Sequence, residues 1–258
     1  MKRDNGCPIM VVHVLRCVLT VAILCGLSLG IAQAEFLSPD LVTITMTDAH
    51  GHSASKGIAN PFEKLPPQAN VPERVQERIA ERFELKHGNT VLGWVDSLGV
   101  DLDGDPVAGI NFSLTAGGSD VTVTVTSATV AFAALMNPAA SAEAEVTLTD
   151  LGGGGATIST LSGNSGLFKA IYNGTQEYGS LLSTSAVGGG SVNFSQDISG
   201  PIAGSVSSIQ AQFAFKLTAG DSAQGSGTFT VVPEPTLIGL ALCGCLTLLV
   251  TRKGRISA

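Results

Sequence analysis

The chain has 258 residues, of which 44% are hydrophobic and 14% are charged, and its formal net charge is −7. Between the two terminal segments described below, residues 35–232 contain eight Lys and Arg against 19 Asp and Glu, a net charge of −11. This acidic excess disfavours nucleic acid as a partner, because phosphate binding requires a basic patch. The same segment is long enough to bury one sizeable core.

The first 34 residues have the order of a secretory signal peptide. Lys2 and Arg3 give a basic start, the 14 residues 17–30 carry no charge, and Ala32 and Ala34 place small residues where signal peptidase cleaves. The apolar run is short for a spanning helix, which needs roughly 20 residues. We therefore expect residues 1–34 to be removed. The alternatives are an uncleaved anchor and lipid attachment at Cys25, where the bulky preceding residues fit poorly.

Residues 35–70 are expected to hold one strand and a loop. Apolar residues alternate with threonines over Leu41–Thr47, which is typical of a half-buried strand. Residues 50–70 are rich in Gly, Ser, Pro and Asn, and this composition predicts a loop or linker.

An amphipathic helix is predicted over residues 71–88. Asn70 precedes it as a possible cap, and Val75, Ile79 and Phe83 recur every four residues, as on one face of a helix. Gly88 is a natural stop. We expect this face to pack on a sheet; the alternative is a helix that binds a partner.

Residues 89–231 are expected to form an antiparallel β-sandwich or barrel-like domain. Short β-prone runs alternate there with turn residues, at the spacing typical of all-β folds. The predicted strands are Gly109–Leu114, Val121–Thr126, Thr129–Leu135, Glu143–Thr149, Ala156–Leu161, Leu167–Tyr172, Ser191–Phe194, Ile209–Leu217 and Gly227–Val232.

The segment 35–232 offers little for catalysis. Its only imidazoles are His50, His52 and His87, it has no cysteine, and no serine lies in a G-x-S-x-G elbow. We therefore predict that the protein is not an enzyme. A secreted hydrolase could use only carboxylates that the sequence does not place together.

Two segments could bind a cation. Asp101, Asp103 and Asp105 lie in one turn, an oxygen-rich arrangement that suits weakly bound Ca²⁺, although an ordinary acidic turn has the same composition. His50 and His52, with Asp48, point the same way if that segment is extended, and could share a metal. Its alternative is a solvated polar loop. No other cofactor is predicted.

The C-terminal segment 232–258 has three parts in a fixed order. Val232-Pro233-Glu234-Pro235-Thr236 comes first, an apolar run follows in a predicted transmembrane helix over 237–251, and Arg252, Lys253 and Arg255 form a basic tail. A buried core helix is the alternative, but three cations directly after the run fit it poorly. The cations are expected to stay on the cytoplasmic side of the membrane. All five cysteines of the chain lie in the two terminal segments.

This order of motif, apolar run and basic tail, together with the signal peptide, resembles the PEP-CTERM sorting domain. The likeness covers about a tenth of the chain, and the short basic tail departs slightly from the family's Arg-rich cluster. It implies recognition by an exosortase, a membrane protease that cleaves near Pro233–Pro235, and a cell that makes exopolysaccharide.

These features predict an exported protein that is held briefly in the membrane and then displayed on the cell surface or released into the extracellular matrix. Its expected partners are signal peptidase, an exosortase, the membrane and exopolysaccharide. The alternative is a secreted module that binds polysaccharide or calcium. Few aromatic residues are available to stack on sugars, since residues 35–232 contain only Trp94, Tyr172 and Tyr178 besides phenylalanines.

Overall fold

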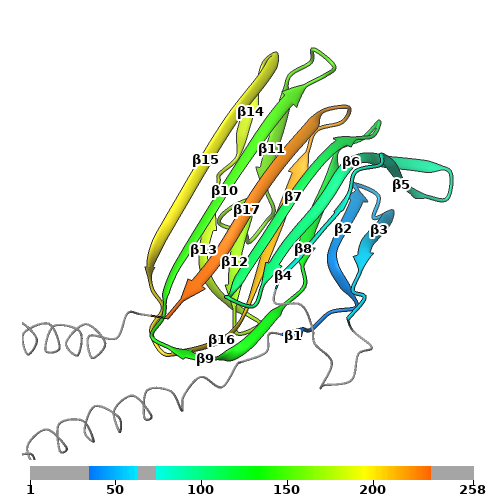
Figure 1. Cartoon of the computed structure of the whole chain (residues 1–258). Helices are drawn as coiled ribbons and strands as arrows, with labels where there is room; N and C mark the ends of the chain where they lie inside the picture. The colour runs from blue at the N-terminus through cyan, green and yellow to red at the C-terminus, as the bar shows by residue number, and fades with distance from the viewer. Residues whose placement is uncertain (1–34, 63–73, 234–258) are drawn as a thin grey trace, which may run out of the picture. The chain divides into compact units, whose positions relative to one another are not determined.

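The computed structural model describes residues 35–62 and 74–233, and the described part is built from antiparallel β-strands without a helix (Figure 1). The strands form a ten-stranded and a seven-stranded sheet, which confirms the mainly β prediction. No helix in these ranges is long and apolar enough to cross a bilayer. The signal peptide and the predicted transmembrane helix both lie outside the described residues.

The ten-stranded sheet has the main order β1-β9-β16-β8-β2-β3, with β11 and β12 also paired to β16. The strands β13 and β14 pair with β12 and β11 respectively. Their bounds are β1 (Glu35–Phe36), β2 (Asp40–Asp48), β3 (Ser53–Ala59), β8 (Val121–Ser127), β9 (Val130–Met136), β11 (Ala156–Thr160), β12 (Phe168–Tyr172), β13 (Gln176–Leu181), β14 (Ser185–Val187) and β16 (Ser205–Leu217).

The seven-stranded sheet has the order β15-β10-β17-β7-β6-β4, and β5 also pairs with β6. Its long strands lie side by side in Figure 1, with β15 outermost. Their bounds are β4 (Arg74–Ile79), β5 (Phe83–His87), β6 (Thr90–Asp103), β7 (Val107–Ala116), β10 (Ala139–Asp150), β15 (Gly190–Pro201) and β17 (Ser222–Val232).

The core lies between the two sheets in a sandwich-like arrangement. Successive side chains of a strand point to opposite faces of the sheet. On β8, Val121, Val123 and Val125 are therefore fully buried, whereas the threonines between them are not. Phe112 of β7 meets Phe213 of β16 edge to face at 5.1 Å between ring centroids. This contact joins the sheets through aromatic packing, which favours such tilted geometries.

The predicted helix over residues 71–88 is wrong. Its described residues form β4 and β5, and both strands pair with β6. A spacing of four residues fits both periods, because positions four apart share a face on a strand as well as on a helix. Val75 is buried and Phe83 half-buried in the strand arrangement. The backbone N–H and C=O groups of this segment bond to the long strand β6 instead of to one another as in a helix.

The predicted loop over residues 50–70 is also wrong in part, because Ser53–Ala59 forms β3 and pairs with β2. A side chain at Gly57 would collide with the carboxylate of Asp40, which explains why a glycine occupies this position of β3. Each of the ten predicted strands overlaps an observed one, and seven of the observed strands are longer than predicted: β2, β7, β8, β10, β15, β16 and β17.

Candidate functional site

The outer face of the seven-stranded sheet is almost entirely polar where β10, β15 and β17 lie together. On β10 and β17, outward polar residues alternate with buried Ala, Val, Leu, Gly and Phe residues. Registered pairing brings the outward residues into rows across the sheet, such as Asp197–Glu143–Thr228 and Ser195–Glu145–Ser226. The rows consist of hydroxyl and carboxylate side chains, which lie at the surface and can hydrogen-bond to a ligand.

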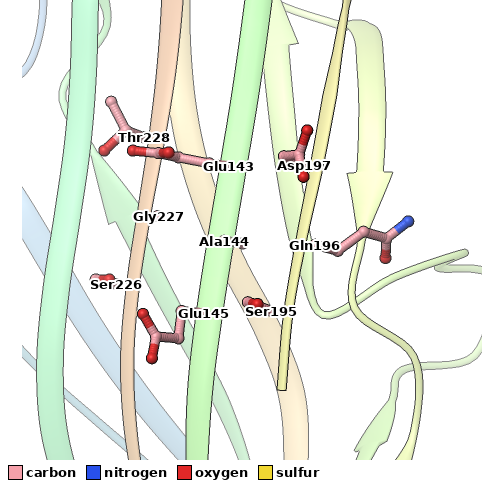
Figure 2. Close-up of a pocket in the computed structure, with 9 residues that line it drawn as sticks. All are labelled: Glu143, Ala144, Glu145, Ser195, Gln196, Asp197, Ser226, Gly227 and Thr228. Carbon is pink, nitrogen blue, oxygen red and sulfur yellow. The ribbon is translucent and has the colours of Figure 1, made fainter. Parts of the chain in front are cut away.

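An open hollow lies on this face, and we call it the acidic hollow (Figure 2). Glu143 and Glu145 project from β10, with Asp197 on the neighbouring strand β15 and Thr228 on β17. Figure 2 shows Gln196 directed away from these groups. Its side-chain oxygen instead accepts a hydrogen bond of 2.8 Å from the backbone N–H of Leu182.

The charge of the acidic hollow is unbalanced. Glu143 stands directly opposite Asp197 in the ladder, and like charges at such positions destabilise a sheet. The residues that line the hollow include no Lys or Arg. Glu145 is oriented by Asn193, whose side-chain amide donates to it at 2.5 Å. The arrangement offers hydrogen-bond acceptors to hydroxyl groups.

The three aspartates predicted for calcium do not stand free. Arg74 donates two hydrogen bonds to Asp101, one of them at 2.9 Å, and Gln76 donates a third. The hydrogen bond from Arg74 holds the pKa of Asp101 below its ordinary value, against the opposing effect of burial. Asp103 accepts from the backbone N–H of Asp105 at 3.0 Å, which closes the turn.

The Asp48, His50 and His52 segment is a tight turn between β2 and β3, and the structure adds His87 to it. His52 Nδ1 lies 2.9 Å from Asp48 Oδ2, and its ring stacks on that of His87 at 5.0 Å between centroids. Burial disfavours the Asp48 carboxylate, but hydrogen bonds from His52 and His50 lower its pKa overall. In residues 35–62 and 74–233 no three His, Cys, Asp or Glu side chains are arranged to hold a metal.

The sorting motif is only partly within the described residues. Val232 ends β17 and Pro233 follows it, whereas Glu234, Pro235, Thr236 and the basic residues Arg252, Lys253 and Arg255 lie outside. Ala32 and Ala34, predicted for signal peptidase, also lie outside the described residues.

The acidic hollow was not predicted from the sequence. Glu143 and Glu145 alternate with alanines in the run AASAEAEV, which identifies them as outward residues of one strand. Their meeting with Asp197 depends on the pairing of β10 with β15, and these strands are separated by four others along the chain.

Comparison with known proteins gives no family for this chain: neither a protein family nor a curated protein matches it. Among solved structures, the enzymatically active domain of bacteriophage CBA120 tailspike protein 4 is similar over 63% of this chain, with 8% identity and a TM-score of 0.29. Infectious bursal disease virus Gx strain is similar over 80% of this chain, with 12% identity and a TM-score of 0.27. The chain spans 20% of the tailspike chain and 58% of the viral one.

Proposed function

We propose that the protein is a non-catalytic component of the cell surface or extracellular matrix, exported and then processed by an exosortase. The observation that carries the proposal is the run Val232–Thr236 with the apolar segment and basic tail that follow it. This segment resembles a PEP-CTERM signal, and the residues before 35 resemble the secretory signal that accompanies it. The partners are signal peptidase, an exosortase and the membrane.

The position of the motif relative to the fold supports this proposal. Val231 is fully buried and its N–H donates to the carbonyl of Pro106. Val232 pairs with Ala139 and is the last residue of β17. Val232, the first residue of the motif, is already 48% exposed. At the other end, the first described strand begins at Glu35, immediately after Ala34. Cleavage at either predicted site therefore removes no residue that the described core uses.

Deleting Pro233–Pro235 in the cell that makes the protein tests this proposal. We expect the deleted protein to remain in the membrane fraction at the mass of the unprocessed C-terminus, and its surface display to fall at least about tenfold. Intact mass and fractionation are the measurements, with Gly154→Ala as a control, because a Cβ at Gly154 meets nothing within 4 Å. Unchanged mass and display in the deleted protein would contradict exosortase sorting.

A second candidate function, polysaccharide binding, is favoured by the lining of the acidic hollow. Its carboxylates and hydroxyls, Glu143, Glu145, Asp197, Ser195 and Thr228, can accept hydrogen bonds from sugar hydroxyls on an open face. Such a site requires no aromatic platform. The chain's one tryptophan, Trp94, lies on β6 with the guanidinium of Arg82 5.4 Å from its ring centroid.

Calorimetric titration of the full chain in detergent with exopolysaccharide from the producing cell tests this second function. We expect the unaltered protein to release or absorb heat on binding. The affinity should fall at least about tenfold in the Glu143→Gln variant, because the amide replaces a hydrogen-bond acceptor with a donor. Glu84→Gln, at an exposed position of β5, is the matched control. A separate titration with Ca²⁺ distinguishes cation binding from sugar binding, and silence in both titrations would overturn the second function.

A further inference from the structure

The strand β15 is a long edge strand whose outer backbone has no partner among the described strands. It spans 12 residues, pairs only with β10, and is exposed at most positions. Figure 1 shows it as the outermost strand of its sheet. An edge of this length presents a row of unused N–H and C=O groups to any strand that approaches it.

The ladder identifies which groups are unused. The N–H of Ile202 donates to the carbonyl of Pro138 at 2.9 Å, one step beyond the last registered pair of β10 with β15. Hydrogen-bonded pairs alternate along an antiparallel ladder, so the even-numbered residues of β15 bond to β10. The free N–H and C=O groups therefore belong to the odd-numbered residues: Ser191, Asn193, Ser195, Asp197 and Ser199.

This edge lacks the devices that natural proteins use to block unwanted pairing. Such devices include lysine, proline and inward charges along the strand. The only charged residue of β15 is Asp197, and its only proline, Pro201, is the last residue. The opposite edge of the same sheet differs, because β4 carries Arg74, Glu77 and Arg78 within six residues.

The inward residues of β15 also leave apolar surface uncovered. Val192 and Phe194 are half-buried against the core, and Ile198 is 39% exposed. A second strand beside β15 would cover these side chains while it satisfies the backbone. Burial of this apolar surface would favour the pairing.

We propose that two copies of this chain pair through β15, antiparallel about a two-fold axis at Ser195, so that their seven-stranded sheets become one continuous sheet. This register uses every free N–H from Ser191 to Ser199 and leaves Pro201 outside the ladder. It sets Asp197 opposite Asn193, a charge next to a neutral amide, and Val192 opposite Ile198. A register centred on Asp197 would instead face two carboxylates toward each other, which is unfavourable.

The proposed dimer requires neither sorting nor polysaccharide binding, although Ser195 and Asp197 of β15 also line the acidic hollow. Native mass spectrometry of the full chain in detergent, over a dilution series, tests it. We expect a species of two chains in the unaltered protein. Ser195→Lys brings two ammonium groups together at the axis, where paired Cα atoms lie about 5.5 Å apart, and should raise the dimer dissociation constant at least about tenfold. Ser195→Pro removes the central free donor and should do the same.

Gln224→Lys is the matched control, because it adds the same charge on the outward face of the central strand β17 and should leave the dimer unchanged. Circular dichroism of each variant reports folding, and if Ser195→Pro unfolds, Ser195→Lys alone decides. A chain that stays monomeric at all concentrations overturns the proposal. This holds even if the edge of β15 instead pairs with a strand of another protein. A dimer that survives both changes at Ser195 overturns it as well.

Discussion

Replacing Phe213 with alanine is expected to lower the free energy of unfolding by about 3–5 kcal/mol, the usual cost of truncating a buried aromatic residue. Phe213 is fully buried on β16 of the ten-stranded sheet. Its ring lies 5.1 Å from that of Phe112 on the seven-stranded sheet and 4.9 Å from that of Phe168 on its own sheet. Truncation leaves a cavity at the point where the two sheets meet.

Urea denaturation of the full chain in detergent, followed by the fluorescence of Trp94, measures this loss as a shift of the midpoint. The matched control is Phe132→Ala on β9, because Phe132 is only half-buried and its truncation opens less of a cavity. We expect the control to lose about 1 kcal/mol, a typical value for a single substitution. Equal losses in the two variants would contradict the placement of Phe213 between the sheets.

Sequence reasoning found strands where alternation was strict and failed where one pattern fits two structures. Val121–Thr126 alternates valine and threonine without interruption and forms β8 as predicted. Residues 74–87 carry apolar residues four apart, and only the presence of the long strand β6 decides in favour of strands. That decision is made by tertiary pairing, which local propensity does not contain.

The candidate site was less predictable than the fold for a related reason. Each outward position of β10 could be identified from its own alternation with alanine. The neighbours of Glu143 could not, because Asp197 and Thr228 reach it only through the order β15-β10-β17 and the register of those pairs. Arg74 likewise meets Asp101 through the register of β4 on β6. A predicted acidic turn thus becomes, in part, an ion pair.

Replacing Gly227 of β17 with alanine is also expected to destabilise the protein, because phenylalanine rings pack closely against the backbone there. A Cβ on Gly227 would lie 2.6 Å from Cε2 of Phe168 and 3.0 Å from Cε2 of Phe213. Both rings are fully buried, so neither can move aside without disturbing its neighbours. We expect Gly227→Ala to lower the free energy of unfolding by about 1–3 kcal/mol, the usual cost of overpacking.

Gly118→Ala is the matched control in the same denaturation experiment, because nothing lies within 4 Å of a Cβ at Gly118. It should be neutral or should stabilise the protein by about 0.4–1 kcal/mol through the unfolded chain. If the loss at Gly227 comes from the Phe168 ring, then Gly227→Ala should cost less in a Phe168→Leu background than in the unaltered protein. Strictly additive losses would place the cause elsewhere, since residues in contact are expected to couple by about 0.5–3 kcal/mol.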